Sequence, residues 1–235
     1  MKTNTKKQLK ASIVTLCALL LIFATILGTL AYLTDTKTVT NTFTVGNVQI
    51  KLDEAKVNVD GNPVDENGNV VADIKDATRT DSGNGNDPEK PIKIVPAKVV
   101  TKDPTITVVA GSEACYVRAK VTVTFVNGTK NATDYKTDHL DDMFSGIATT
   151  GEWTFIEGTA ENTSVVYEYR YKNVVAYSDS DTKLAPVFST ITMPKTWTHT
   201  NMSEIGGMKI VVTAQAIQAE GFANADAAWA EFPNA

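Results

Sequence analysis

The sequence predicts an all-β fold, an antiparallel β-sandwich of the jelly-roll type with short helices in loops and near the C-terminus. Many short segments alternate apolar and polar residues, turn-forming residues separate them, and helical patterns are few and short. No repeat of fixed length occurs, and strands do not alternate with long helices, which argues against a parallel α/β fold. With 235 residues and 43% hydrophobic content, the chain is long enough for one substantial core.

The first strongly patterned segment is Thr34–Val45. Threonine occupies every second position from Thr34 to Thr44, and the opposite parity carries apolar residues near its far end. Threonine is β-branched and favours extended backbone, so the segment is expected to be a strand with a hydroxyl face and an apolar face. The residues that define these faces are Thr34, Thr36, Thr38, Val39, Thr40, Thr42, Phe43 and Val45.

A second strand is expected directly after the first. The apolar parity switches after Val45 to Val48, Ile50 and Leu52, so Gly46-Asn47 must break the register by a bulge or turn. Further strands are predicted by alternation or by β-forming composition at Tyr116–Val126, Trp153–Ile156, Val165–Lys172, Leu184–Met193 and Met208–Gln218. Helical patterns are limited to Tyr135–Phe144 and Asn224–Phe232.

Residues 53–98 differ in composition from the strands around them. Gly, Asn, Asp and Pro are frequent here, and these residues form turns and supply no core, so we expect a polar surface insertion with a mobile tip at Asp81–Pro91. The oxygen-bearing side chains invite comparison with a calcium loop starting at Asp65. An EF-hand would require Gly at the sixth position and Glu at the twelfth, where this chain has Val70 and Asp76. A solvated acidic turn is the preferred interpretation.

Residues 1–31 are typical of an export signal. Four lysines precede an uncharged apolar run, and small residues stand at the two positions that a signal peptidase reads, so cleavage is expected between Ala31 and Tyr32. The run is also long enough to span a bilayer, which leaves an uncleaved anchor as the alternative. Lipid attachment at Cys17 is disfavoured because the small residue expected before such a cysteine is missing.

The charge of the expected mature form restricts its partners. Removal of the four lysines takes the formal net charge from −5 to −9, so neither nucleic acid nor an anionic lipid surface is expected to bind. Cys115 would be the one remaining cysteine, which excludes an intramolecular disulfide. The expected organisation is a signal peptide at 1–31, an extended segment at 32–46 and a β-sandwich domain at 47–235.

No pattern in the sequence predicts a catalytic centre. His139 lies among Asp138, Asp141 and Asp142, which makes these four residues weak candidates for a metal site, but no zinc-binding spacing accompanies them. His199 has no nearby acid or nucleophile, and no nucleophile-elbow motif occurs. Cys115 at a strand start is expected to be a small buried hydrophobic residue. No cofactor is predicted, and calcium or zinc would be unsupported.

Three stretches of the sequence resemble the TasA/camelysin family of exported Gram-positive proteins. The first is the cleavage region, with Ala31-Tyr32, then Asp35, then Asn41-Thr42-Phe43-Thr44-Val45-Gly46-Asn47-Val48. The second is Lys102–Thr107 followed by Ala114–Val121, and the third is Ala216–Phe222 with Ala228-Trp229. The insertion at 53–98 has no counterpart in this resemblance.

The resemblance implies a jelly-roll subunit that a dedicated ER-type signal peptidase frees and that polymerises into fibres of the extracellular biofilm matrix. In such fibres, the N-terminal segment of one subunit inserts as a strand into the sheet of the next. The residues of Thr34–Val45 suit this role because the segment lacks proline and its alternating faces fix a register. From the residues alone, an edge strand that pairs within its own domain is equally open.

Two other functions stay open at this level. Camelysin-like members are catalogued as surface metallopeptidases, although this sequence lacks a recognisable zinc motif. A monomeric or membrane-anchored adhesion domain is the other alternative. The expected location is extracellular or at the cell surface, and the expected partners are further copies of the chain, the signal peptidase and other matrix proteins.

Overall fold

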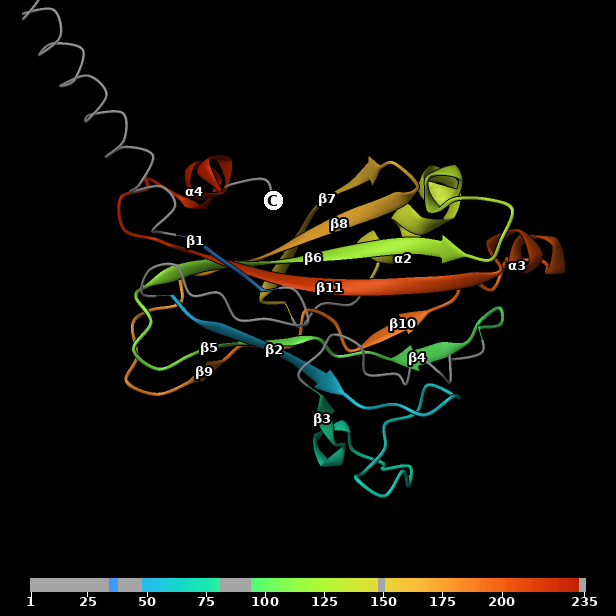
Figure 1. The fold of residues 1–235 in the computed structure, drawn as a ribbon, viewed down its shortest axis with the longest axis horizontal. Helices are drawn as coiled ribbons and strands as arrows, with labels where there is room; N and C mark the ends of the chain where they lie inside the picture. The colour runs from blue at the N-terminus through green and yellow to red at the C-terminus, as the bar shows by residue number, and fades with distance from the viewer. Residues whose placement is uncertain (1–33, 38–47, 81–93, 148–150, 233–235) are drawn as a thin grey trace, which may run out of the picture.

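The computed structural model describes residues 34–37, 48–80, 94–147 and 151–232. Within these residues the fold is mostly β, with antiparallel sheets arranged in two layers and short helices at the ends of the layers (Figure 1). The antiparallel, mostly β prediction is therefore confirmed.

The larger layer is a five-stranded sheet with the order β1-β11-β6-β8-β7. All its neighbouring strands are antiparallel. Its bounds are β1 Thr34–Lys37, β6 Cys115–Val126, β7 Trp153–Glu161, β8 Ser164–Tyr171 and β11 Gly207–Gln218. The central pair, β6 and β11, is twelve residues long on both sides and aligns Gly207 with Val126 and Gln218 with Cys115.

The second layer consists of two smaller sheets. Four strands pair in the order β3-β2-β5-β9, and β10 pairs separately with β4. The bounds are β2 Ile50–Ala55, β3 Arg79–Thr80, β4 Val99–Thr101, β5 Thr105–Val108, β9 Thr182–Lys183 and β10 Thr190–Thr192.

The main core lies between the two layers. The larger sheet contributes alternate residues of β6, β8 and β11, such as Val121, Tyr167 and Val212, which are fully buried. The second layer contributes Ile50 and Ile106, which are also fully buried. The alternation predicted for Tyr116–Val126 and Val165–Lys172 is confirmed, because one parity of each strand faces this core.

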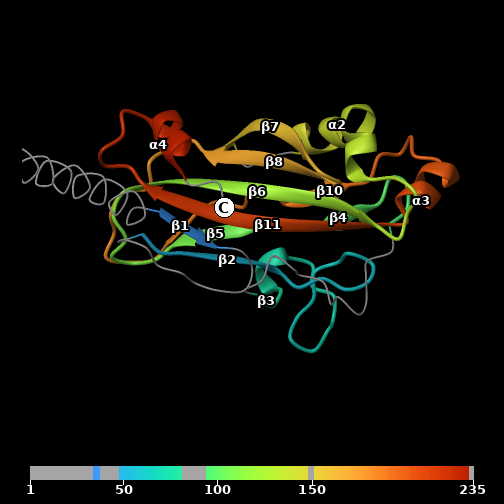
Figure 2. The ribbon, with the colours of Figure 1, turned by 45° about the horizontal axis from the view of Figure 1, so that its top comes forward.

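A smaller cluster lies on the other face of the five-stranded sheet. Helix α4 (Ala225–Glu231) covers the end of β11 there, and Figure 2 shows the helix on the side of β11 away from β2 and β5. The cluster consists of Ile217, Ala228, Trp229 and Phe232, with Tyr116, Phe222 and Ala225 packed against it. Asn224 caps α4 by accepting a hydrogen bond from the Ala227 amide, as a short polar residue at a helix start does.

The predicted helix at Tyr135–Phe144 has a less regular form than expected. The 3₁₀ turn η2 (Ala132–Tyr135) leads into the π-helical turn η3 (Lys136–Leu140), which continues as α2 (Asp141–Ser145). A further helix, α3 (His199–Ile205), was not predicted. It begins with a reciprocal capping box between Thr198 and Asn201 and ends at Gly206, whose φ is +66°.

The predicted strand Leu184–Met193 is wrong over most of its length. β9 ends before it, only Thr190–Thr192 forms a strand, and Leu184, Val187 and Phe188 are buried in irregular backbone. These residues are apolar because they are buried in the core, not because they form a strand. Pro186, which lies between them, has no backbone amide to donate a hydrogen bond to a neighbouring strand.

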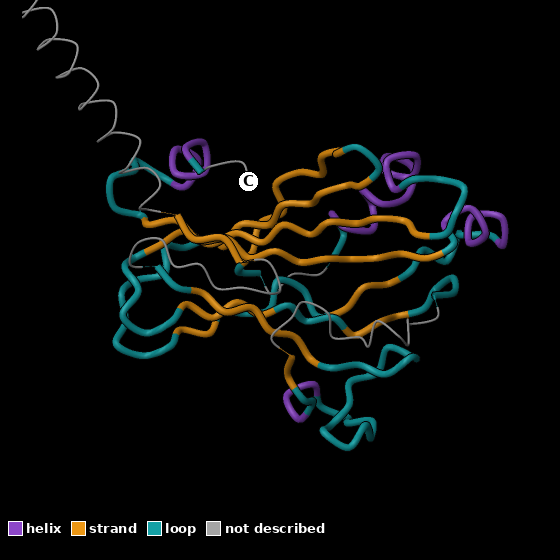
Figure 3. The backbone as a smooth tube through the Cα atoms, viewed as in Figure 1, coloured by secondary structure: helices purple, strands orange, loops and turns teal. Residues whose placement is uncertain are grey.

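The polar insertion leaves the second layer at the end of β2 and returns at β4. Strand β2 runs to Ala55, three residues past Leu52. The described part of the insertion contains isolated bridges, such as Val57 with Pro63, and the short 3₁₀ helix η1 (Ile74–Asp76). Figure 3 shows it mainly as loops that project beyond β3. The predicted mobile tip at Asp81–Pro91 lies outside the described residues.

Candidate assembly site

The N-terminal strand pairs with an edge of its own domain. β1 lies antiparallel to β11, with Thr34 opposite Ile217 and Lys37 opposite Ala214. The structure thus has Thr34–Lys37 in the intramolecular pairing that the sequence left open. The other residues of the predicted assembly strand, Thr38, Val39, Thr40, Thr42, Phe43 and Val45, lie outside the described residues, as do the predicted cleavage residues Ala31 and Tyr32.

Most of the β11 edge extends beyond β1. The pairing with β1 covers Ala214–Ile217, and among the strands that the structure describes none pairs with this edge along Gly207–Thr213. These seven residues contain no proline, so each carries a backbone amide and a carbonyl. An edge of this kind accepts a further strand.

The faces of this edge differ in character. Val212, Ala214 and Ala216 belong to the main core, and Met208 and Ile210 pack against it. The opposite parity is mixed in character, from exposed Lys209 through half-buried Val211 to buried Gln215. A strand added along this edge would therefore meet apolar side chains of β11 on the core face and a mixture of polar and apolar side chains on the other.

Helix α4 is held over the end of this edge by Arg118. The guanidinium carbon of Arg118 lies 4.4 Å from the centre of the Trp229 ring and 5.0 Å from that of Phe232. Its Nε donates to the side-chain oxygen of Gln215 at 2.7 Å, and its Nη1 lies 3.2 Å from Glu168. The group thus joins β6, β8, β11 and α4 at the end of β11 where β1 pairs.

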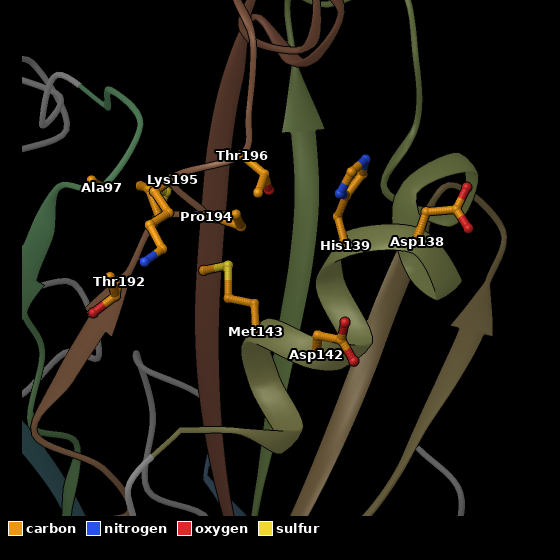
Figure 4. A pocket seen from close by; sticks show the side chains of 10 residues that line it. Ala97, Asp138, His139, Asp142, Met143, Thr192, Pro194, Lys195 and Thr196 are labelled. Atoms are coloured by element: carbon orange, nitrogen blue, oxygen red, sulfur yellow. The ribbon is translucent and has the colours of Figure 1, made fainter.

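The weak metal candidates do not converge. Asp138, His139 and Asp142 line one side of an open cavity, and Figure 4 shows the three side chains pointing in different directions. Asp141 instead accepts hydrogen bonds from Lys136 at 2.8 Å and Tyr167 at 3.1 Å. Within the described part of the chain, no three His, Cys, Asp or Glu side chains are grouped closely enough to hold a metal ion.

His139 packs among aromatic rings. Its ring centre lies 5.0 Å from that of Tyr135 and 6.0 Å from that of Trp197, and it meets the latter edge to face. The Tyr135 hydroxyl donates to Glu204 of α3 at 2.5 Å, and burial together with this contact raises the pKa of Tyr135. The arrangement positions α3 against the π-helical turn. His199 is the exposed first residue of α3.

Cys115 is completely buried at the start of β6, as predicted, and burial raises the pKa of its thiol to about 12. A thiol that stays protonated at neutral pH is a poor nucleophile.

Sequence reasoning missed a buried ionic cluster at the root of the insertion. Lys102 Nζ lies 2.7 and 3.0 Å from the two carboxylate oxygens of Glu54. Beside it, Arg79 bridges Asp53 and Asp103, and Asp103 also accepts the Ala55 amide at 2.7 Å. The only sign of this cluster in the sequence is that charged residues interrupt strand-like segments. The sequence does not show which of them pair, because the members of each ion pair are far apart in the chain.

Comparisons of the chain with known proteins identified no related protein. No family model, no curated protein and no solved structure matches the chain. Over the described residues, no helix has the length and apolar character to cross a membrane.

Proposed function

We propose that this protein is an exported structural subunit that polymerises into extracellular matrix fibres, with the N-terminal strand of each subunit completing the sheet of the next. The proposal extends the sequence resemblance to the TasA/camelysin family, and with it we assign the two layers to a jelly roll of that type. The observation that carries it is the edge of β11, paired with β1 over Ala214–Ile217 and without a described partner over Gly207–Thr213.

The register of β1 gives the proposed donor strand a definite position. A donor strand from a neighbouring subunit that keeps this register runs antiparallel to β11, so each later residue of the donor lies opposite an earlier residue of β11. Val39 then lies opposite Val212, and Phe43 lies opposite Met208, both on the core face. The alternate threonines lie on the other face, with Thr42 opposite Lys209.

A donor strand would pair with more of the edge than the described β1 does. It would extend the ladder from four residue pairs to eleven, ending with Thr44 opposite Gly207. Adding a strand in this way uses main-chain hydrogen bonds for affinity and side-chain alternation for register. In this arrangement each subunit gives its strand to one neighbour and receives a strand from another, so the addition is head-to-tail and generates a filament.

Export would control this assembly. While the apolar segment at 11–33 is attached, the strand that follows it is tethered at the membrane, and cleavage between Ala31 and Tyr32 would free it. The proposed partners are other copies of the chain, with the signal peptidase acting before assembly.

Electron microscopy of the purified mature form, residues 32–235, tests the proposal. We expect filaments from this form and single particles from a form that starts at Gly46. A matched control carries Thr→Ser substitutions at Thr36, Thr38 and Thr40, which keep the chain length and the hydroxyl face. The proposal is wrong if the mature form stays monomeric across pH and salt conditions, or if the truncated form makes equally good filaments.

A further inference from the structure

A fibre built through β11 brings two particular ends of the domain together. This inference rests on the proposed function. In the register described above, Thr44 of the donor lies opposite Gly207, the residue that follows α3 and Gly206. Val48, where the body of the donor subunit begins, is only four residues further along. Because an extended chain spans at most about 3.6 Å per residue, the two positions lie within about 14 Å of each other.

Near Val48, the surface of the donor subunit consists of the loop between β5 and β6 and the loop between β8 and β9, which are hydrogen-bonded to each other. The Val109 amide donates to the Gln49 carbonyl at 2.9 Å, and the Gln49 amide donates to Ser112 Oγ at 3.0 Å. The Gly111 amide in turn donates to the Ser178 carbonyl at 2.8 Å, which attaches the loop between β8 and β9. This end of the domain lies opposite the α3 end (Figure 1).

Tyr177 is the prominent side chain of this loop. It is 55% exposed, an unusual degree for a large aromatic residue. Its hydroxyl donates to Asp179 at 2.8 Å. Two hydrogen bonds between Val175 and Cys115, both 2.9 Å, fix the base of the loop to the buried start of β6. The loop therefore presents an aromatic ring and a carboxylate on a rigid support.

The α3 end of the domain carries a cavity of about 450 Å³. It lies between the π-helical turn with α2 on one side and residues 192–196, which lead into α3, on the other (Figure 4). Met143, Met193 and Pro194 supply apolar lining, Lys195 supplies an ammonium group, and Asp138 and Asp142 supply carboxylates on the opposite side. Methionine sulfur atoms make favourable contacts with aromatic rings, and a volume of this size accommodates one aromatic side chain.

We infer a second interface between consecutive subunits, in which the loop Val174–Asp181 of the donor subunit docks at the α3-end cavity of the subunit that receives its strand. The Tyr177 ring occupies the cavity against Met143 and Met193, and the Asp179 carboxylate faces Lys195. The interface fixes the rotation of one subunit on the next, which a tether of three residues between Thr44 and Val48 leaves undetermined.

Cysteine cross-linking of assembled mature protein tests this interface. The variant combines Tyr177→Cys with Lys195→Cys, and a short bis-maleimide is added after assembly. The native Cys115 is completely buried and does not compete. We expect a ladder of covalent oligomers on a denaturing gel. The control combines Tyr177→Cys with Glu66→Cys, an exposed position in the insertion, and is expected to remain largely monomeric on the gel.

The outcomes separate the two proposals. Filaments that depend on residues 32–45 but cross-link no better than the control overturn the docking interface and leave the strand mechanism standing. Absence of filaments overturns both. In a second measurement, Tyr177→Ala is expected to raise the concentration needed for assembly about tenfold, whereas Tyr177→Phe keeps the ring and stays within about threefold. Equal effects of the two substitutions would contradict a role for the ring.

Discussion

Lys102 Nζ lies 2.7 Å from a carboxylate oxygen of Glu54, and both side chains are almost completely buried between the end of β2 and the start of β5. The pair stands where the polar insertion joins the sandwich, next to Arg79 with its two aspartates. The insertion is therefore attached to the domain by charged groups.

Removing one member of this pair should destabilise the domain strongly. We expect Lys102→Met to lower the free energy of unfolding by about 3–5 kcal/mol, because it leaves the Glu54 carboxylate buried without its cation. The double variant Lys102→Met with Glu54→Leu should lose less than the single variant. Denaturant unfolding of the mature protein measures both, and a loss below about 1 kcal/mol for Lys102→Met would contradict the prediction.

The contact between Arg118 and Trp229 should contribute to the docking of α4. A double-mutant cycle with Arg118→Met and Trp229→Leu is expected to give a coupling energy of about 1–2 kcal/mol, as for partly desolvated cation–π pairs. The free energy of unfolding of the four proteins provides the measurement. A coupling energy near zero would mean that α4 is held by its apolar contacts alone.

The proposed donor register predicts opposite effects for two adjacent residues. Phe43→Lys places a charge on the face of the strand that meets the core and should raise the concentration needed for assembly at least tenfold. Thr42→Glu places a carboxylate opposite Lys209 on the other face, where an opposite-charge pair is weakly favourable. Light scattering during assembly measures both variants. Equal loss of assembly for the two would exclude this register.

Alkaline pH should destabilise the protein through the buried thiol of Cys115. The pKa of this thiol is raised from an ordinary value of 9.0 to about 12. Its contribution to stability is therefore fully present below pH 9 and is lost as pH rises toward 12, at about 1.4 kcal/mol per pH unit in that range. Thermal unfolding between pH 8 and 11 measures the loss. Burial also raises the pKa of Tyr169 and Tyr171, so Cys115→Ala should reduce the slope mainly between pH 9 and 10, and an unchanged slope there would contradict the assignment.

The strands that the sequence predicted best are those with one solvent-exposed face and one buried face. β6, β8 and β11 follow their alternation because each lies in the larger sheet with its apolar parity toward the core. Leu184–Met193 was mistaken for a strand because Leu184, Val187 and Phe188 are buried in a loop, and composition does not separate a buried loop from a short strand.

Other features of the structure depend on contacts between residues that are far apart in the sequence, and these contacts could not be predicted from it. Helix α3 has few strong helix formers and is defined by its Thr198 cap and its packing on Tyr135 through Glu204. The Glu54–Lys102 pair joins residues 48 positions apart. The sequence predicted a donor segment but no particular acceptor edge, and the position of that edge along Gly207–Thr213 comes from the register of β1.

The most direct test of the account is a cryo-electron microscopy map of the assembled mature protein, resolved well enough to trace the backbone. Donor-strand assembly predicts that the strand beside Gly207–Thr213 of β11 connects to the body of the next subunit, with Val39 opposite Val212 and Phe43 opposite Met208. A strand that traces back into its own subunit, or filaments joined through other surfaces with this edge left open, would contradict it.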